Sequence, residues 1–133
     1  MSLFDRFRGQ PEWQHEDPSV RASAVDDLED DAQDLLTAIA SEDADPGVRA
    51  AAVVRLSDPE ILRRIVRTDQ DGGVRAEAVA MLRMMAVDDT DAERAAGALA
   101  GLSEARDLGE VARTARLEAI SGSALERLDG QKA

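Results

Sequence analysis

The sequence predicts an all-α protein built from about five tandem repeats, each made of two short helices. One unit, residues 58–82, reads DPEILRRIVRTDQDGGVRAEAVAML and places its apolar residues in the pattern L-x2-[IV]-x8-[VI]-x3-A-x3-L. The same pattern begins again at Leu36 and at Leu108. Apolar residues three or four apart indicate helices with one buried face, and recurrence of the unit along the chain indicates a helical repeat protein.

The composition agrees with this fold and excludes several classes of protein. A chain of 133 residues is long enough for one domain with a buried core. Phe4, Phe7 and Trp13 are the only aromatic residues, which suits thin helices that pack closely through Ala, Val and Leu. Cysteine is absent, so disulfides and thiolate metal sites are excluded. Because the sequence has neither an apolar run of membrane-spanning length nor a signal-peptide core, we expect a cytoplasmic protein that does not enter a membrane.

The starts of the helices are marked by their capping residues. Asp is favoured at the N-cap and Pro at the first helical position. Asp-Pro pairs stand at residues 17–18, 45–46 and 58–59. The predicted pairs of first and second helices are 17–28 with 32–41, and 46–56 with 58–67. Residues 1–16 precede them and are expected to form an N-terminal cap, since the end of a repeat array needs a cover.

The spacing of the repeats changes near the middle of the chain. Apolar anchor positions of the first helices fall at 20, 48, 74, 94 and 120, so the step from 74 to 94 is six residues shorter than the steps beside it. Six residues also separate Leu56 from Leu62 across the turn inside a repeat. We therefore predict a fused helix from about Val74 to Ala86 in the third repeat. Helices over 91–102, 105–114 and 118–128 follow, with Arg94 in an anchor position and residues 129–133 as a frayed tail.

The first helices share a motif that resembles a known family. Residues 17–28, 45–56 and 71–82 read DPSVRASAVDDL, DPGVRAAAVVRL and DGGVRAEAVAML. This DPxVRxxAxxxL pattern resembles the HEAT family of helical repeats, and the short period is similar to that of its leucine-rich-variant branch. The resemblance covers roughly residues 17–128 and implies a short right-handed α-solenoid that serves as a protein-binding scaffold. The stretch PEWQHEDPSVR also resembles the start of larger bacterial proteins of unassigned function.

The resemblance does not identify a reaction, because relatives with this fold have different functions. They include bilin lyases and base-excision DNA glycosylases. The iron–sulfur cysteines of some leucine-rich-variant proteins have no counterpart here, so no cofactor is expected. A glycosylase would also need aromatic residues around an extruded base, and all three aromatic residues precede the repeats. A subunit that assists a modification enzyme such as a bilin lyase is an alternative that rests on the fold alone.

An Asp and an Arg recur together at the start of the first helices. The pairs are Asp17 with Arg21, Asp45 with Arg49, and Asp71 with Arg75. The arginines could form a ladder for an anionic partner, or each could bridge to a turn aspartate of its own or the adjacent repeat. In the last repeat Leu117 and Ser121 replace the Asp and the Arg together. This joint loss favours the structural interpretation, because a buried Arg without its partner is costly.

The second helices carry the predicted partner-binding residues. The chain has a net charge of −12, yet residues 46–83 hold five acidic residues against seven arginines. In helical repeat arrays, curvature creates a concave binding surface, which we expect the second helices to line. The arginines expected to face outward from these helices are Arg63, Arg64, Arg67, Arg106 and Arg113. They are predicted to bind an acidic or helical segment of another protein, and the alternative is a solvated face with Glu60 and Arg64 as an ordinary helical ion pair.

No group of residues indicates an enzyme. The sequence lacks a catalytic triad, a metal cluster and a phosphate-binding loop, and His15 is its only histidine. The acidic run 26–34 lacks the Gly and the closing Glu of a calcium loop. We therefore expect a non-enzymatic scaffold that binds another protein without a metal or cofactor. A nucleic-acid-binding module that uses the same arginines is the alternative, and the acidic net charge argues against it.

Overall fold

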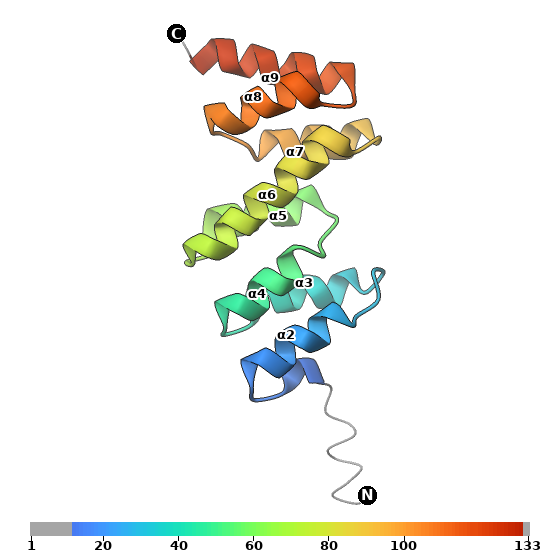
Figure 1. Cartoon of the computed structure of the whole chain (residues 1–133), viewed down its shortest axis with the longest axis vertical. Coiled ribbons are helices and arrows are strands. Elements are labelled where there is room, and N and C mark those ends of the chain that lie inside the picture. Colours follow the sequence, from blue (N-terminus) through green and yellow to red (C-terminus); the bar gives the residue numbers. More distant parts are fainter. Residues whose placement is uncertain (1–11, 132–133) are drawn as a thin grey trace, which may run out of the picture.

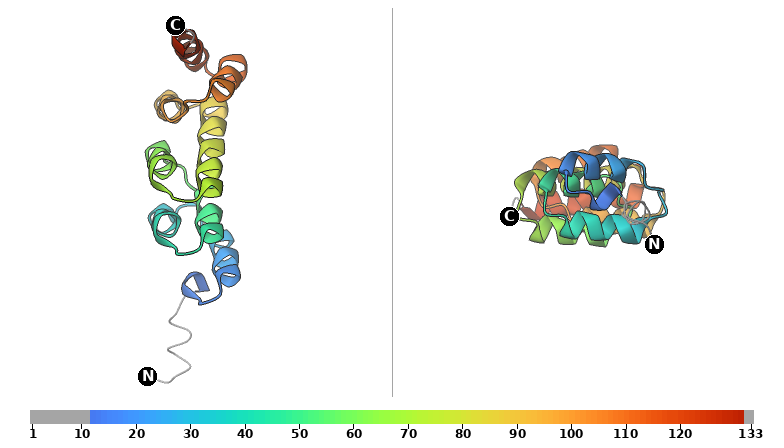
Figure 2. Two further views of the ribbon diagram at one scale, coloured as in Figure 1. Left: turned by 90° about the vertical axis from the view of Figure 1, so that its left-hand side faces the viewer. Right: turned by 90° about the horizontal axis from the view of Figure 1, so that it is seen from below.

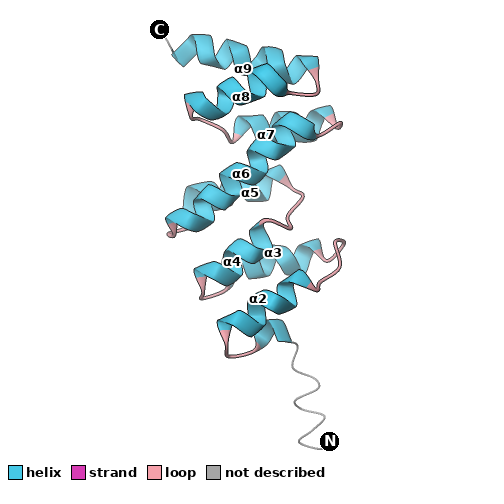
Figure 3. Ribbon diagram, in the orientation of Figure 1, coloured by secondary structure: helices cyan, strands magenta, loops and turns pink. Residues whose placement is uncertain are grey.

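The computed structural model describes residues 12–131, which form eight α-helices, one short 3-10 helix and no strand (Figure 3). The 3-10 helix η1 spans Glu12–Gln14. The α-helices are α2 Pro18–Asp26, α3 Gln33–Glu42, α4 Pro46–Val53, α5 Pro59–Thr68, α6 Gly72–Asp88, α7 Ala92–Ala100, α8 Ala105–Thr114 and α9 Glu118–Gln131. The all-α class is therefore confirmed for the described residues. None of these helices is both long enough and apolar enough to cross a lipid bilayer.

The helices stack along one long axis in chain order, with α2 and α9 at opposite ends of the stack (Figure 1). Seen from the side, they form two layers (Figure 2). Helices α2, α4, α6 and α8 follow one another in one layer, and α3, α5 and α7 lie in the other. Helix α9 packs against both α7 and α8 and closes this end of the stack. Such an elongated arrangement leaves both layers with long outer faces.

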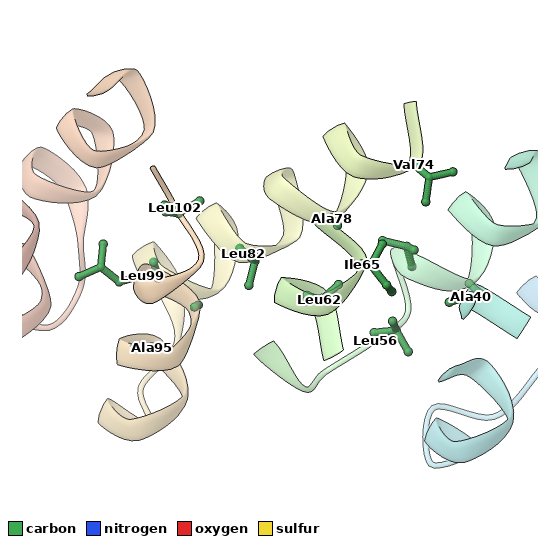
Figure 4. Close-up of a cluster of buried hydrophobic side chains, with 14 of the residues drawn as sticks. Ala40, Leu56, Leu62, Ile65, Val74, Ala78, Leu82, Ala95, Leu99 and Leu102 are labelled. Carbon is green, nitrogen blue, oxygen red and sulfur yellow. The ribbon is translucent and has the colours of Figure 1, made fainter. Parts of the chain in front are cut away.

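The core lies between the two layers and contains the apolar positions that the repeated pattern predicts. All five positions of the unit at 58–82 are buried, and so are all five positions of the unit that begins at Leu36. In the last copy Leu108, Val111, Ile120 and Ala124 are buried, and Leu128 packs against the core while partly exposed. Figure 4 shows how α5 and α6 contribute side chains to one continuous cluster that reaches α7. The spacing of Leu, Ile, Val and Ala thus predicts the core correctly.

Aspartates cap most of the helices, as the sequence predicts. Asp45 Oδ2 accepts a hydrogen bond from the Val48 N–H at 3.1 Å, and Asp71 Oδ2 accepts one from the Val74 N–H at 3.0 Å. Asp17, Asp58 and Asp91 cap α2, α5 and α7 in the same manner. A side-chain oxygen at this position satisfies one of the N–H groups that the first turn leaves unpaired. These caps fix where each helix begins.

Helix α6 confirms the prediction of one fused helix in the middle of the chain. It runs without a break from Gly72 to Asp88, slightly beyond the predicted ends. The helices alternate between the two layers along the whole described chain, so one helix in place of two reverses the layers of the predicted first and second helices that follow it. Helix α7 was expected beside α2, α4 and α6 but packs in the layer of α5, and α8 packs against α6.

Two details of the C-terminal half correct the sequence-based expectation. Arg94 was expected in the buried anchor position of α7, but it is exposed, and Ala95 is buried in its place. Helix α9 continues to Gln131, past the predicted end at residue 128, and the Gln131 side chain donates to the Ser103 carbonyl. Of the expected N-terminal cap, Trp13 packs against the core, whereas Leu3, Phe4 and Phe7 lie outside the described residues.

Candidate functional site

Two arginines of the repeated Asp–Arg motif hold neighbouring helices together. The Nε and Nη2 atoms of Arg21 in α2 each lie 3.0 Å from a carboxylate oxygen of Asp43, the residue that ends α3. Arg49 in α4 bonds in the same way to Asp69, which ends α5, at 2.9 and 3.1 Å. Paired hydrogen bonds between a guanidinium and a carboxylate are strong and directional. Each bond therefore fixes one helix against the turn that follows the next helix.

The aspartates that were predicted as partners have another role. Asp17, Asp45 and Asp71 accept hydrogen bonds from the helix N–H groups that they cap, and none forms an ion pair with the predicted arginine among residues 12–131. The pairings of Asp17 with Arg21, Asp45 with Arg49 and Asp71 with Arg75 are therefore corrected, whereas the expected bridge to a turn aspartate is present for Arg21 and Arg49. These arginines reach a carboxylate in a later turn, because the cap carboxylate is already held by its own helix.

The aspartates that bond to Arg49 and Arg94 are stabilised in their charged form. Burial by itself raises the pKa of Asp69, but hydrogen bonds from Arg49 and from the Asp71 N–H more than offset it, so the pKa lies below its ordinary value. Near the end of α6, the pKa of Asp89 is lowered chiefly by the hydrogen bonds from Arg94, which donates to it through Nε at 2.7 Å. Both aspartates also accept the N–H of the N-cap residue two positions later. They are structural carboxylates with their acceptor positions filled.

Two further arginines cap helix C-termini across the stack. Arg55, just beyond α4, donates to the Val25 and Leu28 carbonyls at the end of α2. Arg127 in α9 donates to carbonyl oxygens at the end of α7 in the corresponding way. Carbonyl groups at a helix C-terminus have no partner within the helix, and a cation is favoured there. These two arginines therefore hold helices together, and we call them, with Arg21 and Arg49, the framework arginines.

Arg63 does not face outward as predicted. Its Nη1 donates to the Gly97 carbonyl of α7 at 2.9 Å, and its side chain is partly buried between α5 and α7. A Cβ atom on Gly101 would lie only 2.6 Å from the Arg63 Cγ, which shows how closely the side chain follows α7. Because Arg63 bonds to another helix, it leaves the set of predicted partner-binding residues and joins the framework.

The other four predicted partner-binding arginines are exposed, but they do not form one surface. Arg64 and Arg67 lie on the exposed face of α5, whereas Arg106 and Arg113 are exposed on α8. Because the layers exchange after α6, α5 and α8 belong to opposite layers. The Arg106 side chain is 83% exposed, and its closest carboxylate is that of Asp107 at 3.7 Å. The single concave stripe that the sequence predicts is therefore divided into two arginine pairs.

The pair on α5 is free of intramolecular ion pairs. Among residues 12–131, neither Arg64 nor Arg67 donates a side-chain hydrogen bond or forms a salt bridge, and Glu60 does not pair with Arg64. The arginines of the framework, in contrast, each bond to a neighbouring helix or turn. Two exposed cations on one helix face of an acidic chain can bind carboxylates or phosphates through their forked donors.

Sequence reasoning missed one buried charge. Asp107, near the start of α8, is 1% exposed and accepts a hydrogen bond from Arg83 of α6 at 3.1 Å. Arg83 also lies 3.2 Å from a carboxylate oxygen of Glu110, so it joins α6 to α8 twice. The sequence places Asp107 next to the buried Leu108. Its partner could not be predicted from the repeat pattern, because that pattern does not place α8 against α6.

A charged groove lies between the starts of α5 and α7. It has a volume of about 370 Å³, and its charged lining consists of Asp58, Glu60, Asp91, Glu93, Arg63 and Arg94. The two arginines are already bonded, Arg63 to Gly97 and Arg94 to Asp89. Among the described residues no group of three or more His, Cys, Asp or Glu side chains is arranged to hold a metal ion.

No family model, curated protein or solved structure matches this chain. The resemblance to HEAT repeats therefore stays a prediction from the motif at 17–28, 45–56 and 71–82.

Proposed function

We propose that this protein is a non-enzymatic scaffold that binds an acidic segment of another protein through Arg64 and Arg67 of α5. In this proposal the two-layer stack is a short right-handed α-solenoid of about five HEAT-like repeats, with α6 in place of a helix pair. A cytoplasmic location and the absence of a cofactor are parts of the same proposal.

The observation that carries the proposal is that α5 presents two neighbouring exposed arginines without an ion pair among the described residues, whereas on α8 Arg113 has none but Arg106 lies 3.7 Å from the Asp107 carboxylate. The chain has a net charge of −12, so an exposed cation would usually find a carboxylate of its own chain. Most arginines do find a partner on a neighbouring helix or turn, as Arg21, Arg49 and Arg83 show. Arg64 and Arg67 have no such partner among residues 12–131. Unpaired arginines on a rigid helix are a common means of recognising acidic partner segments.

An affinity capture from host lysate tests the proposal. The native protein is compared with Arg64→Glu/Arg67→Glu and with the control Arg106→Glu/Arg113→Glu, which makes the same charge change on α8. Both pairs are exposed, so circular dichroism melts of the two variants should match that of the native chain. The proposal predicts a protein partner that binds the native chain and the α8 control but is lost from the α5 variant. Equal capture by all three proteins would contradict it.

The same experiment addresses the nucleic-acid alternative. If a nuclease-sensitive RNA or DNA is captured in place of a protein, the arginines of α5 bind phosphate. The affinity should then fall steeply and log-linearly with salt concentration, because each phosphate contact releases bound counterions.

A further inference from the structure

The arginines of the Asp–Arg motif share an anchor that orients their free donors. Nη1 of Arg21 donates to the carbonyl of His15, and Nη1 of Arg49 donates to the carbonyl of Asp43, at 2.8 and 2.9 Å. In both cases this carbonyl stands six residues before the arginine. The opposite edge of each guanidinium, Nε with Nη2, is then presented to the carboxylate of the next turn. The chain itself therefore shows which ligand this arrangement binds.

Arg75 has the same anchor and lacks the ligand. Its Nη1 donates to the carbonyl of Asp69, again six residues earlier, at 2.7 Å. No carboxylate or carbonyl within residues 12–131 accepts from its Nε or Nη2. Of the aspartates before Arg75, Asp69 is already bonded to Arg49 through both oxygens and Asp71 caps α6 through the Val74 N–H.

The missing ligand follows from the fused helix. In α2 and α4 the arginine meets an aspartate that ends the next helix, twenty to twenty-two residues later. The helix that follows α6 ends at Gly101 and not at an aspartate, and Gly101 lies against Leu82 of the long helix α6. The fold thus contains three anchored arginines, of which Arg21 and Arg49 have an aspartate partner and Arg75 has none among residues 12–131.

We propose that the Nε and Nη2 edge of Arg75 binds an aspartate of a partner protein, in a segment where a helix ends in an Asp-x-Asp turn. Both intramolecular ligands have this form: Asp43 and Asp69 each end a helix and accept the N–H of the aspartate two residues later. The inference rests on the proposed function and specifies the acidic segment that the scaffold recognises. Arg67, one of the two α5 arginines of the proposed function, stands in the last turn of α5, eight residues before Arg75 in the sequence.

The test uses a peptide that copies the chain's own ligand. The peptide QDLLTAIASEDADP, which reproduces residues 33–46, is titrated into the full-length 15N-labelled protein, and the arginine Nε–Hε signals are followed by NMR. The Arg75 signal should shift with peptide concentration, whereas those of Arg21 and Arg49 should stay in place because their acceptors are present. A second peptide, with Asn at the position of Asp43, should bind about tenfold more weakly, since one charge-assisted pair is lost.

Two variants separate this inference from the proposed function. Arg75→Lys keeps the charge but removes the paired donors, and Arg113→Lys is the matched control on α8. Loss of peptide binding in Arg75→Lys alone, in a protein with an unchanged circular dichroism spectrum, supports the inference. Binding that requires Arg64 and Arg67 but leaves the Arg75 signal unmoved would overturn it and leave the proposed function intact. A titration in which no arginine signal shifts would also overturn it.

Discussion

Replacing a glycine by alanine should change the free energy of unfolding in opposite directions at Gly101, which is closely packed, and at Gly122, which is not. A Cβ atom at Gly101 would lie 2.6 Å from the Arg63 Cγ and 2.7 Å from the Cδ1 of the fully buried Leu82. Both distances are shorter than a carbon–carbon contact allows, so Gly101→Ala forces the two side chains to move. The Gly101 backbone has φ −85° and ψ −5°, which alanine adopts freely, so the effect reports packing and not backbone strain.

The expected magnitude follows from two opposing terms. Overpacking of a buried contact typically destabilises a protein by about 1–3 kcal/mol. Replacing Gly by Ala at an unstrained position stabilises it by about 0.4–1 kcal/mol, because it lowers the conformational entropy of the unfolded chain. We expect Gly101→Ala to be net destabilising by about 1–2 kcal/mol. Gly122 in α9 is the control, because a Cβ there meets no atom within 4 Å. Gly122→Ala should stabilise the protein by about 0.5–1 kcal/mol through helix propensity.

Urea denaturation followed by circular dichroism measures both effects in the same buffer. A double-mutant cycle with Arg63→Ala then isolates the arginine's share, since removing the Arg63 side chain leaves only the contact with Leu82. Gly101→Ala should therefore be less costly in the Arg63→Ala background. If Gly101→Ala is as stabilising as Gly122→Ala, the assignment of Arg63 to the framework is wrong.

Three further predictions concern the core and the buried charges. Ala78→Leu introduces extra volume at a fully buried contact between the layers and should cost about 1–3 kcal/mol in denaturant unfolding, and an unchanged midpoint would refute the core assignment. Arg83→Met leaves the buried Asp107 carboxylate without its main partner and should destabilise by about 2–3 kcal/mol, whereas the added change Asp107→Leu should recover part of this loss. Because the pKa of Asp69 is lowered in the folded protein, its contribution to stability is complete above the unfolded-state pKa of about 4 and is lost as the pH falls through the lower folded-state pKa. Asp69→Asn should accordingly flatten the acid side of the stability profile.

Local features of this fold could be predicted from the sequence, and the path of the chain after α6 could not. The helix starts follow from Asp N-caps, and the core follows from the spacing of residues such as Leu62, Val74 and Ala78. The fused helix also follows from the shortened period. The repeat template places α7 with the first helices, whereas one helix in place of two reverses the layers of the later helices, as the contacts of α6 with α7 and α8 show.

The candidate site was predicted in part for the same reason. Helical spacing places Arg63 and Arg64 outside the buried face of α5, but it cannot show that α7 lies against one of them. Arg63 points to α7, where Gly97 and Gly101 leave room for its side chain, and Arg64 is exposed. Likewise, the Asp–Arg motif could be recognised from the sequence, but the true acceptors are Asp43 and Asp69, because the N-cap aspartates are occupied by their own helices.

The most direct test of the proposed function measures stability and binding on the same α5 variant. Arg64→Glu/Arg67→Glu is assayed for its thermal midpoint and for its affinity to the captured partner, beside the α8 control. We predict an unchanged midpoint, because these side chains bond to no other helix, together with a loss of affinity that the control does not show. A variant that binds as tightly as the native chain would contradict the assignment of α5 as the partner-binding surface.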